Sequence, residues 1–523
     1  GLRSPPPYRR ADRCVTAMEA RPPVSAYASA EAALADGAFE RAIDLLETVL
    51  AVDAEDIAAL DLLGQVAQRI DALDSAIDAY QRVLAIDPVY RDTVERLAGA
   101  QTRAGNGPAA YETLKAALSS HGHRPEFWLV MGNVMLSMAL FEEAVAAYGK
   151  ALEINPRSAA ARMNLSEAEL RRGRVDHALA LARTAAEGAP TMPGVFDNLA
   201  QILLATGHYG EAWAAFEKRF DHFGAGPQFD LKARDFPQPR WRGEPLAGRG
   251  LLVWCEQGVG DEIYYAGLFP ALARMGATIA VECEPRMAPL LRRAFPTFTV
   301  VPREDPPAPV LTDGRWDFQV PAGSLMGLLR PDENPAASPG GAFLRAEPAQ
   351  AAALRARYQG LRPGPLIGIS WRSGNRGATY QRSIPLADWR PLLTHPDLHV
   401  LSLQYGDHGA EIVALRGQLN FGLHTDLSVD PLVSLDDFAA QVAACDAVVS
   451  VANSTIHMAA ALGVPTLACL DTAPDGRWGL DRREDGHYLS VRLYRQTRGG
   501  EWGDVMERVV ADLVAGDVPS DLR

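Results

Sequence analysis

The sequence predicts an α-helical repeat array followed by an α/β region with two doubly wound parallel sheets. Three observations predict this class. Small and large apolar residues recur every 34 positions in the first half, strand-like and helix-like segments alternate in the second half, and two strands pass into helices through glycine-rich or hydroxyl-rich turns. Stacked helical hairpins give such a repeat, and alternating strands and helices give a parallel sheet covered on both faces.

Shifts in pattern and composition divide the chain into six expected segments. They are a disordered or upstream-derived segment at 1–22, the repeat array of about six units at 23–220, a linker at 221–248, a first α/β half at 249–362, a second α/β half at 363–500, and a terminal helical segment at 501–523.

Two columns of small residues carry the repeat. They are Ala42, Ala76, Ala110, Ala144, Ala178 and Ala212, and, twelve positions earlier in each of the last five units, Gly64, Ala98, Gly132, Ser166 and Ala200. A small residue lets the two helices of a hairpin approach closely, and a large residue four positions after the alanine, such as Tyr80 or Tyr148, fills the space beside them. Prolines such as Pro88 and Pro156 end the second helix of a unit.

This pattern resembles tetratricopeptide repeats over residues 23–220. The resemblance implies a superhelix whose concave face binds peptides or proteins, although a structural spacer or a dimerisation element remains an alternative. Asn164 and Asn198 occupy equivalent positions of successive repeats, where their amides could clamp an acceptor peptide backbone. Ordinary polar surface or bonds between helices explain them equally well.

Composition excludes several classes of function. A net charge of −14 argues against general binding to nucleic acid or anionic membranes, which need a basic excess. No apolar run reaches the roughly 18 residues of a membrane-spanning helix, and residues 1–23 lack the apolar core of a secretory signal. We therefore expect a cytoplasmic protein. The five cysteines form no CxxC pair, and those at 255, 283, 445 and 469 are expected to be reduced and buried, with no metal site.

The first α/β half begins with a strand at 250–255, and a helix is expected from about 261 to 275. The intervening loop carries three carboxylates, Glu256, Asp261 and Glu262, at the strand end where open α/β sheets bind ligands. Asp261 alone suits a helix cap. Three acids exceed what capping needs, so one of them is a candidate general base toward a hydroxyl group. Further strands are expected at 278–282, near 299 and at 317–320.

The second half opens with a strand at 366–371, followed by Arg372, Ser373 and Gly374, and later by Arg382. Arginines and glycines at a strand end suit a diphosphate, although a solvated loop also explains them. Ser370 and, at the end of a strand at 398–403, Gln404 are added as candidate donor-site residues.

A strand at 447–451 then passes through Asn453, Ser454 and Thr455 into a helix. The N-terminus of a helix offers N–H groups and the positive end of its dipole to a phosphate or sugar. His457, about one turn into this helix, is either a ligand contact or a packed side chain.

The motifs Gly258-Val259-Gly260-Asp261 and Ser450-Val451-Ala452-Asn453-Ser454-Thr455-Ile456-His457-Met458-Ala459 resemble the heptosyltransferase-like group of GT-B glycosyltransferases over about residues 240–510. The resemblance implies two Rossmann-like domains, a nucleotide-sugar donor on the second one, Asp261 as the base, and Arg382 on the donor phosphates. It also implies a metal-independent reaction without a cofactor, and a last helix, 503–515, that crosses back to the first half. The group usually has aspartate where this chain has Asn453.

Repeats fused to such a module resemble bacterial protein glycosyltransferases, including flagellin glycosyltransferases, and in broader logic the eukaryotic O-GlcNAc transferase. The expected function is therefore transfer of a sugar to Ser or Thr hydroxyls of a protein held by the repeats, with flagellin as the best single acceptor. Two alternatives stay open: a lipopolysaccharide or other glycan as acceptor, and a non-catalytic repeat scaffold whose GT-B domain has decayed.

Overall fold

The computed structural model describes residues 24–222, 234–330, 341–374, 382–485 and 487–519. The expected terminal segment 1–22 and residues 223–233 of the expected linker lie outside these residues. The chain forms two compact units, which divide between His121 and Gly122. The division falls inside the repeat region and not at residue 220, because the later repeats pack on the α/β region.

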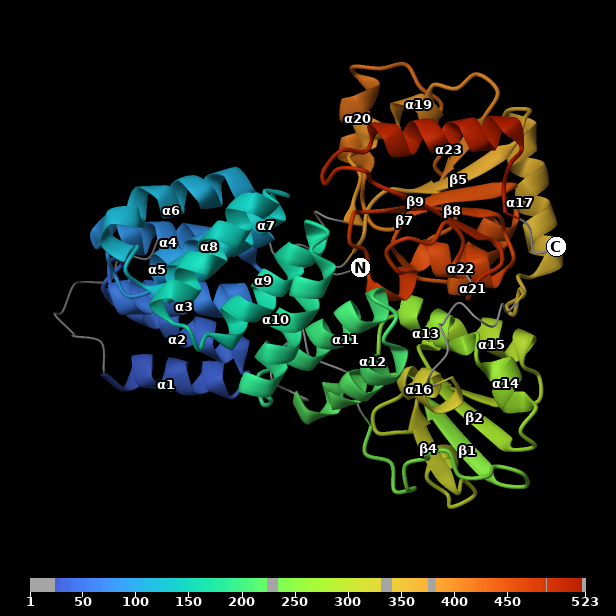
Figure 1. Ribbon diagram of the computed structural model, residues 1–523, viewed down its shortest axis with the longest axis horizontal. Helices are drawn as coiled ribbons and strands as arrows, with labels where there is room; N and C mark the ends of the chain where they lie inside the picture. The colour runs from blue at the N-terminus through green and yellow to red at the C-terminus, as the bar shows by residue number, and fades with distance from the viewer. Residues whose placement is uncertain (1–23, 223–233, 331–340, 375–381, 486, 520–523) are drawn as a thin grey trace. The chain divides into compact units, whose positions relative to one another are not determined.

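The repeat region consists of helix pairs in both units (Figure 1). The first unit contains α1 (Val24–Ala35), α2 (Phe39–Val52), α3 (Ile57–Arg69), α4 (Leu73–Ile86), α5 (Thr93–Arg103) and α6 (Gly107–His121). The second unit begins with α7 (Pro125–Ser137), α8 (Phe141–Ile154), α9 (Ala159–Arg171), α10 (Val175–Gly188), α11 (Val195–Ala205), α12 (Tyr209–Phe216) and the 3-10 helix η1 (Glu217–His222).

The column of small residues has the predicted packing role. A Cβ atom on Gly64 would lie 2.5 Å from Cε1 of Tyr80, and one on Gly132 would lie 2.3 Å from Cε1 of Tyr148. Both tyrosines are fully buried. In each case the aromatic ring of the second helix lies directly against the backbone of the first, so the glycine sets the distance between the helices.

The first α/β half contains a four-stranded parallel sheet in the order β3-β2-β1-β4. Its strands are β1 (Gly250–Trp254), β2 (Thr278–Cys283), β3 (Thr299–Pro302) and β4 (Phe318–Pro321). Its helices are α13 (Val259–Ala266), α14 (Phe269–Ala273), α15 (Ala288–Ala294) and α16 (Leu325–Leu329), with 3-10 turns η3 (Pro285–Met287), η4 (Pro309–Leu311) and η5 (Ala322–Ser324). The single helix expected at 261–275 is wrong: two short helices occupy this stretch, because Pro270 cannot continue a helix from its interior.

The second half contains a five-stranded parallel sheet in the order β6-β5-β7-β8-β9. Its strands are β5 (Leu366–Ser370), β6 (His399–Ser402), β7 (Ala447–Val451), β8 (Thr466–Leu470) and β9 (Val491–Arg495). The other elements are α17 (Pro348–Leu361), η6 (Leu386–Trp389), α19 (Arg390–Leu393), α20 (Gly409–Arg416), α21 (Leu435–Ala443), α22 (Ser454–Ala461), η7 (Gly476–Trp478) and α23 (Gly503–Ala515). Every residue of β5, β7 and β8 is buried, as expected for strands covered on both faces.

Helix α23 corrects one expectation. It does not cross back to the first half: Val505, Met506 and Val509 pack with Trp389 and Leu392 of the second half, on the side of the sheet seen beside α19 and α20 in Figure 1. The buried side chains of α23 belong to the apolar cluster of the second half, which also contains Leu467 and Cys469 of β8.

One continuous apolar core joins the later repeats to both α/β halves. It includes Leu203 and Trp213 of the repeats, Val253 of the first sheet, and Val448 and Ala459 of the second half. The four cysteines among the described residues are free and buried, which confirms their expected burial. None of the helices in the described ranges has the length and apolar character needed to span a bilayer.

Replacing Gly132 with alanine should destabilise the second unit by about 1–3 kcal/mol, because the new methyl group meets the ring of buried Tyr148. The midpoint of urea unfolding measures the effect. Gly149→Ala is the matched control: Gly149 also lies in a helix, but a Cβ atom placed there would have no neighbour within 4 Å, so alanine there should stabilise by up to about 1 kcal/mol. Equal shifts for the two variants would contradict the packing role.

Candidate functional site

A cavity of about 440 Å³ lies between the two α/β halves. Its size suits a small-molecule ligand. The residues that line it are Gly258, Val259, Gly260, Asp261, Ile263, Arg286, Ser373, Gly374, Arg382, Tyr405, Pro431, Leu432, Leu435, Phe438, Ala452, Asn453, Ser454, His457, Met458, Asp475, Arg477 and Trp478. Most of them follow the carboxyl ends of strands in both sheets, where α/β proteins bind ligands, and the others lie just before or at the start of α21.

Two helix N-termini meet at the cavity. Helix α13 begins after Gly258 and helix α22 begins after Asn453. A Cβ atom on Gly260 would lie 3.2 Å from Cδ2 of His457 and 3.4 Å from the Cα of Ser454. Glycine at 260 therefore allows a close approach of the two halves at the cavity, and the positive ends of both helix dipoles favour an anion between them.

Charged side chains line one side of the cavity. Nη2 of Arg477 lies 2.7 Å from Oδ1 of Asp261, which links the two halves, and Nε of Arg477 lies 3.0 Å from Oδ1 of Asp475. Nη2 of Arg382 lies 3.7 Å from Oδ2 of Asp475. The Arg477 guanidinium carbon lies 4.8 Å from the ring centre of Tyr264. Asp475 thus organises two arginines that face the same space.

These contacts set the protonation states on this side. Burial opposes the charge of Arg477, but the carboxylates of Asp475 and Asp261 outweigh it and hold the pKa of Arg477 well above its ordinary value. Burial also opposes the charge of Asp475, but Arg477 and Arg382 lower the pKa of Asp475 to about 2. Both side chains are therefore charged at neutral pH.

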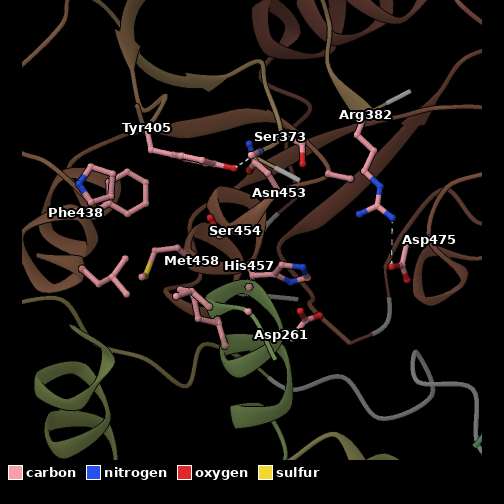
Figure 2. A pocket seen from close by; sticks show the side chains of 18 of the residues that line it. Asp261, Ser373, Arg382, Tyr405, Phe438, Asn453, Ser454, His457, Met458 and Asp475 are labelled. Carbon is pink, nitrogen blue, oxygen red and sulfur yellow. Dashed lines mark hydrogen bonds and ion pairs between the residues drawn. The ribbon is translucent and has the colours of Figure 1, made fainter. Parts of the chain in front are cut away.

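The other side of the cavity is apolar and aromatic. Figure 2 shows Tyr405 and Phe438 on the side opposite Arg382 and Asp475, with Asn453, Ser454 and His457 between them. The hydroxyl of Tyr405 accepts a 2.7 Å hydrogen bond from the backbone N–H of Gly374. Leu432, Leu435 and Met458 add further apolar side chains to the cavity lining. A ligand that fits both ends would carry a flat or apolar group at one end and negative charge in the middle.

Asn453 connects the two strands that lead into the cavity. Its Oδ1 accepts a 2.9 Å bond from the N–H of Thr455 and caps α22, while Ser450 donates to the same oxygen at 3.0 Å. Its Nδ2 donates to Oγ of Ser370 at 2.8 Å and to the carbonyl oxygen of Arg372 at 3.0 Å. The amide is thus a donor and an acceptor at once, which a carboxylate cannot be. This geometry gives Asn453 a structural reason to be asparagine.

His457 both lines the cavity and belongs to a buried aromatic cluster. Its Nδ1 lies 3.0 Å from the hydroxyl of Tyr488, and its ring stacks on Trp478 with centroids 5.5 Å apart. Burial and the nearby Arg477 charge hold the pKa of His457 well below its ordinary value. Beneath it, burial lowers the pKa of His487 to about 3. Both rings are neutral at pH 7.

Two of the three predicted catalytic carboxylates are not at the cavity. Glu256 is 1% exposed and accepts from Nη2 of Arg219 at 2.7 Å and from the N–H of Gly323. Glu262 is also buried and accepts from the N–H of Glu284 at 3.0 Å. These side chains point into the fold, where they compensate buried donors. Of the three carboxylates, Asp261 is the one that lines the cavity. It is the third residue of α13, whose N-cap residue is Gly258 and has no side-chain cap hydrogen bond.

The predicted donor residues also separate into two groups. Ser373, Gly374, Arg382, Asn453, Ser454 and His457 line the cavity, whereas Ser370, Arg372, Gln404 and Thr455 do not. Arg372 forms an ion pair with Glu411, with contacts of 2.9 and 3.0 Å. Oε1 of Gln404 accepts from the N–H groups of Trp371 and Arg372 at the end of β5. These residues satisfy the backbone and charges of the strand ends.

The predicted peptide-binding asparagines are bonded within the repeats. Nδ2 of Asn164 donates to Oδ1 of Asn133 at 2.8 Å, and Oδ1 of Asn198 accepts from Ser166 at 3.0 Å. Both side chains are half-buried. The bonds between helices that the sequence left open are therefore present, and a role in peptide binding stays a prediction.

Several cavity residues escaped sequence reasoning. Asp475 and Arg477 sit in an irregular stretch after β8, and Tyr405, Phe438 and Arg286 lie far from them in sequence. The turn Gly476-Arg477-Trp478-Gly479 after a buried strand was a usable signal, and Arg477 and Trp478 of this turn line the cavity. No cluster of three or more metal-ligating side chains occurs within the part of the chain that the structure describes.

Comparison with known proteins identifies the repeats. The tetratricopeptide repeat family matches residues 27–90 and 129–193. Protein FlbA of Caulobacter vibrioides is 29% identical over 498 residues, which cover 91% of this chain and 82% of FlbA. The tetratricopeptide repeat-containing protein trd-1 of Caenorhabditis elegans is 25% identical over 126 residues, 24% of this chain and 16% of trd-1. The N-terminal repeats are thus tetratricopeptide repeats, and the likeness to FlbA extends through the α/β region.

Solved repeat proteins resemble part of the chain. A MamA protein is 23% identical and covers 32% of this chain and 92% of its own length, with a TM-score of 0.29. A thermophilic repeat protein of Thermus thermophilus is 24% identical and covers 34% of this chain and 98% of its own length, with a TM-score of 0.31.

Asn453→Asp should destabilise the protein by about 1–3 kcal/mol, because the carboxylate cannot donate to Ser370 and would face the carbonyl oxygen of Arg372. Urea unfolding measures the change. Asn420→Asp, at an exposed position, is the control and should shift stability by less than about 0.5 kcal/mol. Parental stability of the Asn453 variant would show that its amide hydrogens are dispensable.

His487 should make stability depend on pH. Its pKa is about 3 when folded, against 6.5 ordinarily, so between these values the unfolded chain binds more protons. The stability that His487 contributes is therefore fully present above about pH 6.5 and is lost as pH falls toward 3, with a limiting slope of about 1.4 kcal/mol per pH unit. His487→Gln should reduce the slope of the unfolding free energy against pH, measured by urea unfolding between pH 4 and 6. His123→Gln, at an exposed site, should keep the parental slope. A parental slope in His487→Gln would contradict the assignment.

Proposed function

We propose that this protein is a glycosyltransferase of the GT-B type, which transfers a sugar from a nucleotide-sugar donor to a Ser or Thr hydroxyl of a protein bound by the repeats. The observation that carries the proposal is the division of the cavity into an aromatic end and a charged end, with two helix N-termini between them. A nucleotide sugar has the matching parts in the matching order: a flat base, a phosphate group and a sugar.

The base would lie against Tyr405 and Phe438, where ring stacking and burial favour a flat heterocycle. The phosphates would lie at the N-terminus of α22, near Ser454 and Arg382. In this proposed arrangement the sugar would lie toward Asp261, on the first α/β half. Arginines and helix dipoles would stabilise the departing phosphate group electrostatically.

The proposed reaction forms one bond and breaks one bond. The acceptor oxygen bonds to the anomeric carbon, and the bond from that carbon to the phosphate oxygen breaks with its electron pair leaving on the phosphate. The proton of the hydroxyl passes to the carboxylate of Asp261. Since Arg477 contacts Asp261 at 2.7 Å, it holds this carboxylate at the cavity edge and balances the charges that change during transfer.

The tetratricopeptide repeats support a protein partner, because such arrays commonly bind polypeptides on their concave face. We propose that the partner is the acceptor, with flagellin as the first candidate. Asn164 and Asn198, on the first helices of successive repeats, remain candidate contacts for it.

The main support for the non-catalytic alternative is Asn453, where the resembling glycosyltransferases usually have aspartate. The hydrogen bonds of Asn453 give the asparagine a structural role at the cavity, so its presence does not by itself indicate a decayed site. A deletion of repeats would distinguish a protein acceptor from a glycan acceptor. Deletion of residues 1–121 is a better test than deletion of the whole repeat array, residues 1–220. The longer deletion removes Trp213 and the other repeat residues of the continuous core.

Incubation of the protein with a panel of nucleotide sugars and flagellin should increase the acceptor mass by one sugar. Asp261→Asn should lower turnover by about 100-fold or more, the usual contribution of a general base, while nucleotide affinity measured by calorimetry stays within a few-fold. The exposed Glu501→Gln variant is the control and should keep parental turnover. Full activity of Asp261→Asn would exclude this residue as the base, and the absence of both binding and transfer across the panel would reject the proposed function.

A further inference from the structure

The loop from Asp471 to Trp478 brings three cavity residues into place, and it rests on the repeats. This loop follows β8 and supplies Asp475, Arg477 and Trp478 to the cavity wall. Helix α11 of the last repeat packs directly on η7, the 3-10 turn inside this loop. The loop on the charged side of the cavity is therefore in contact with residues nearly 300 positions away in the sequence.

The contact between α11 and the loop is close and specific. The side-chain oxygen Oε1 of Gln201 accepts a 2.9 Å hydrogen bond from the backbone N–H of Gly476. A Cβ atom on Gly476 would lie 2.3 Å from the carbonyl oxygen of Gln201 and 2.7 Å from Cβ of Leu204. Gly476 thus lies directly against the helix, between the two cavity residues Asp475 and Arg477.

A second contact fixes the start of the same loop. Nη1 of Arg171 on α9 lies 3.2 Å from Oδ2 of Asp471, and both side chains are less than a tenth exposed. Arg171 is also held by Glu167 on its own helix at 2.6 Å. Two successive repeats therefore hold the loop at two points, one before and one within the segment that faces the cavity.

We propose that Gln201 is a positioning residue of the cavity: its hydrogen bond to Gly476 holds the adjacent Arg477 within reach of Asp261. Gln201 does not line the cavity, so it acts through Arg477. The last repeat is then a structural part of the site, in addition to any surface that it offers to a partner. This proposal rests on the proposed function only for the identity of the reaction at the cavity. The positioning role of Gln201 does not depend on it.

The geometry of Arg477 explains why a fixed backbone matters. Its guanidinium contacts Asp261 at 2.7 Å, Asp475 at 3.0 Å and the Tyr264 ring at 4.8 Å. A planar guanidinium meets three partners only from a narrow range of backbone positions. Freeing Gly476 from Gln201 lets the loop move, and the contact across to Asp261 weakens first, because Asp475 moves with the loop.

Hydrogen–deuterium exchange on the full chain tests this without a ligand. Gln201→Met removes the acceptor at similar side-chain length and should speed exchange about fivefold in the peptide covering 471–479, as loss of one hydrogen bond predicts. Exchange at 258–264, around Asp261, should also rise. Gln201→Glu keeps an acceptor oxygen and should stay within about twofold of the parent.

Gln65→Met is the matched control, since Gln65 occupies the equivalent position four repeats earlier and bonds to Asp61. It should leave 471–479 and 258–264 unchanged. Parental exchange at 471–479 in Gln201→Met, or equal effects of Gln201→Met and Gln201→Glu, would overturn the proposal.

A double-mutant cycle tests whether Gln201 acts through Arg477. Nucleotide affinity, measured by calorimetry with UDP, ADP, GDP and CMP separately, should fall about fivefold in Gln201→Met. On an Arg477→Lys background the same change should have little further effect. Additive losses would overturn the proposed route. If the parent binds none of these nucleotides, the proposed function fails, and the exchange data still decide the positioning role.

Discussion

The partly buried ion pair between Arg477 and Asp261 connects the two α/β halves of the second unit at the cavity. A guanidinium taken out of water costs several kcal/mol unless charges and hydrogen bonds compensate it. Here Asp261 comes from the first half, Asp475 from the second, and the loop that carries Arg477 lies on α11 of the repeats. The charged side of the cavity is thus in contact with all three parts, and its geometry depends on the tertiary fold.

The later repeats are consequently part of the packed core of the second unit. The last two helix pairs share one apolar core with both α/β halves, and Glu256, a predicted catalytic acid, instead compensates Arg219 at the end of the array. Carboxylates at the carboxyl end of a strand can thus serve the joint between domains as well as a reaction. In this chain the first carboxylate of the loop serves the joint, and the cavity receives Asp261.

Much of the architecture followed from local patterns. The 34-residue spacing predicted the helix pairs. In the structure each glycine of this pattern lies under the aromatic ring of its own hairpin, as at Gly132 and Tyr148. The apolar runs predicted the sheets, since parallel strands are buried on both faces. Strand β9 and the break between α13 and α14 were missed, the first because its alternating arginines mask a buried strand, the second because Pro270 was read as part of one helix.

The sequence by itself determined the repeats, the alternation of strands and helices, and the turns at 258–261 and 453–457 that open toward the cavity, because each depends on residues close in the chain. The tertiary structure decided which polar side chains reach the cavity. Arg477 and Asp261 are 216 positions apart, and Gln201 and Gly476 are 275 apart. No local pattern encodes such pairs, because burial and charge compensation arise only when distant segments pack together.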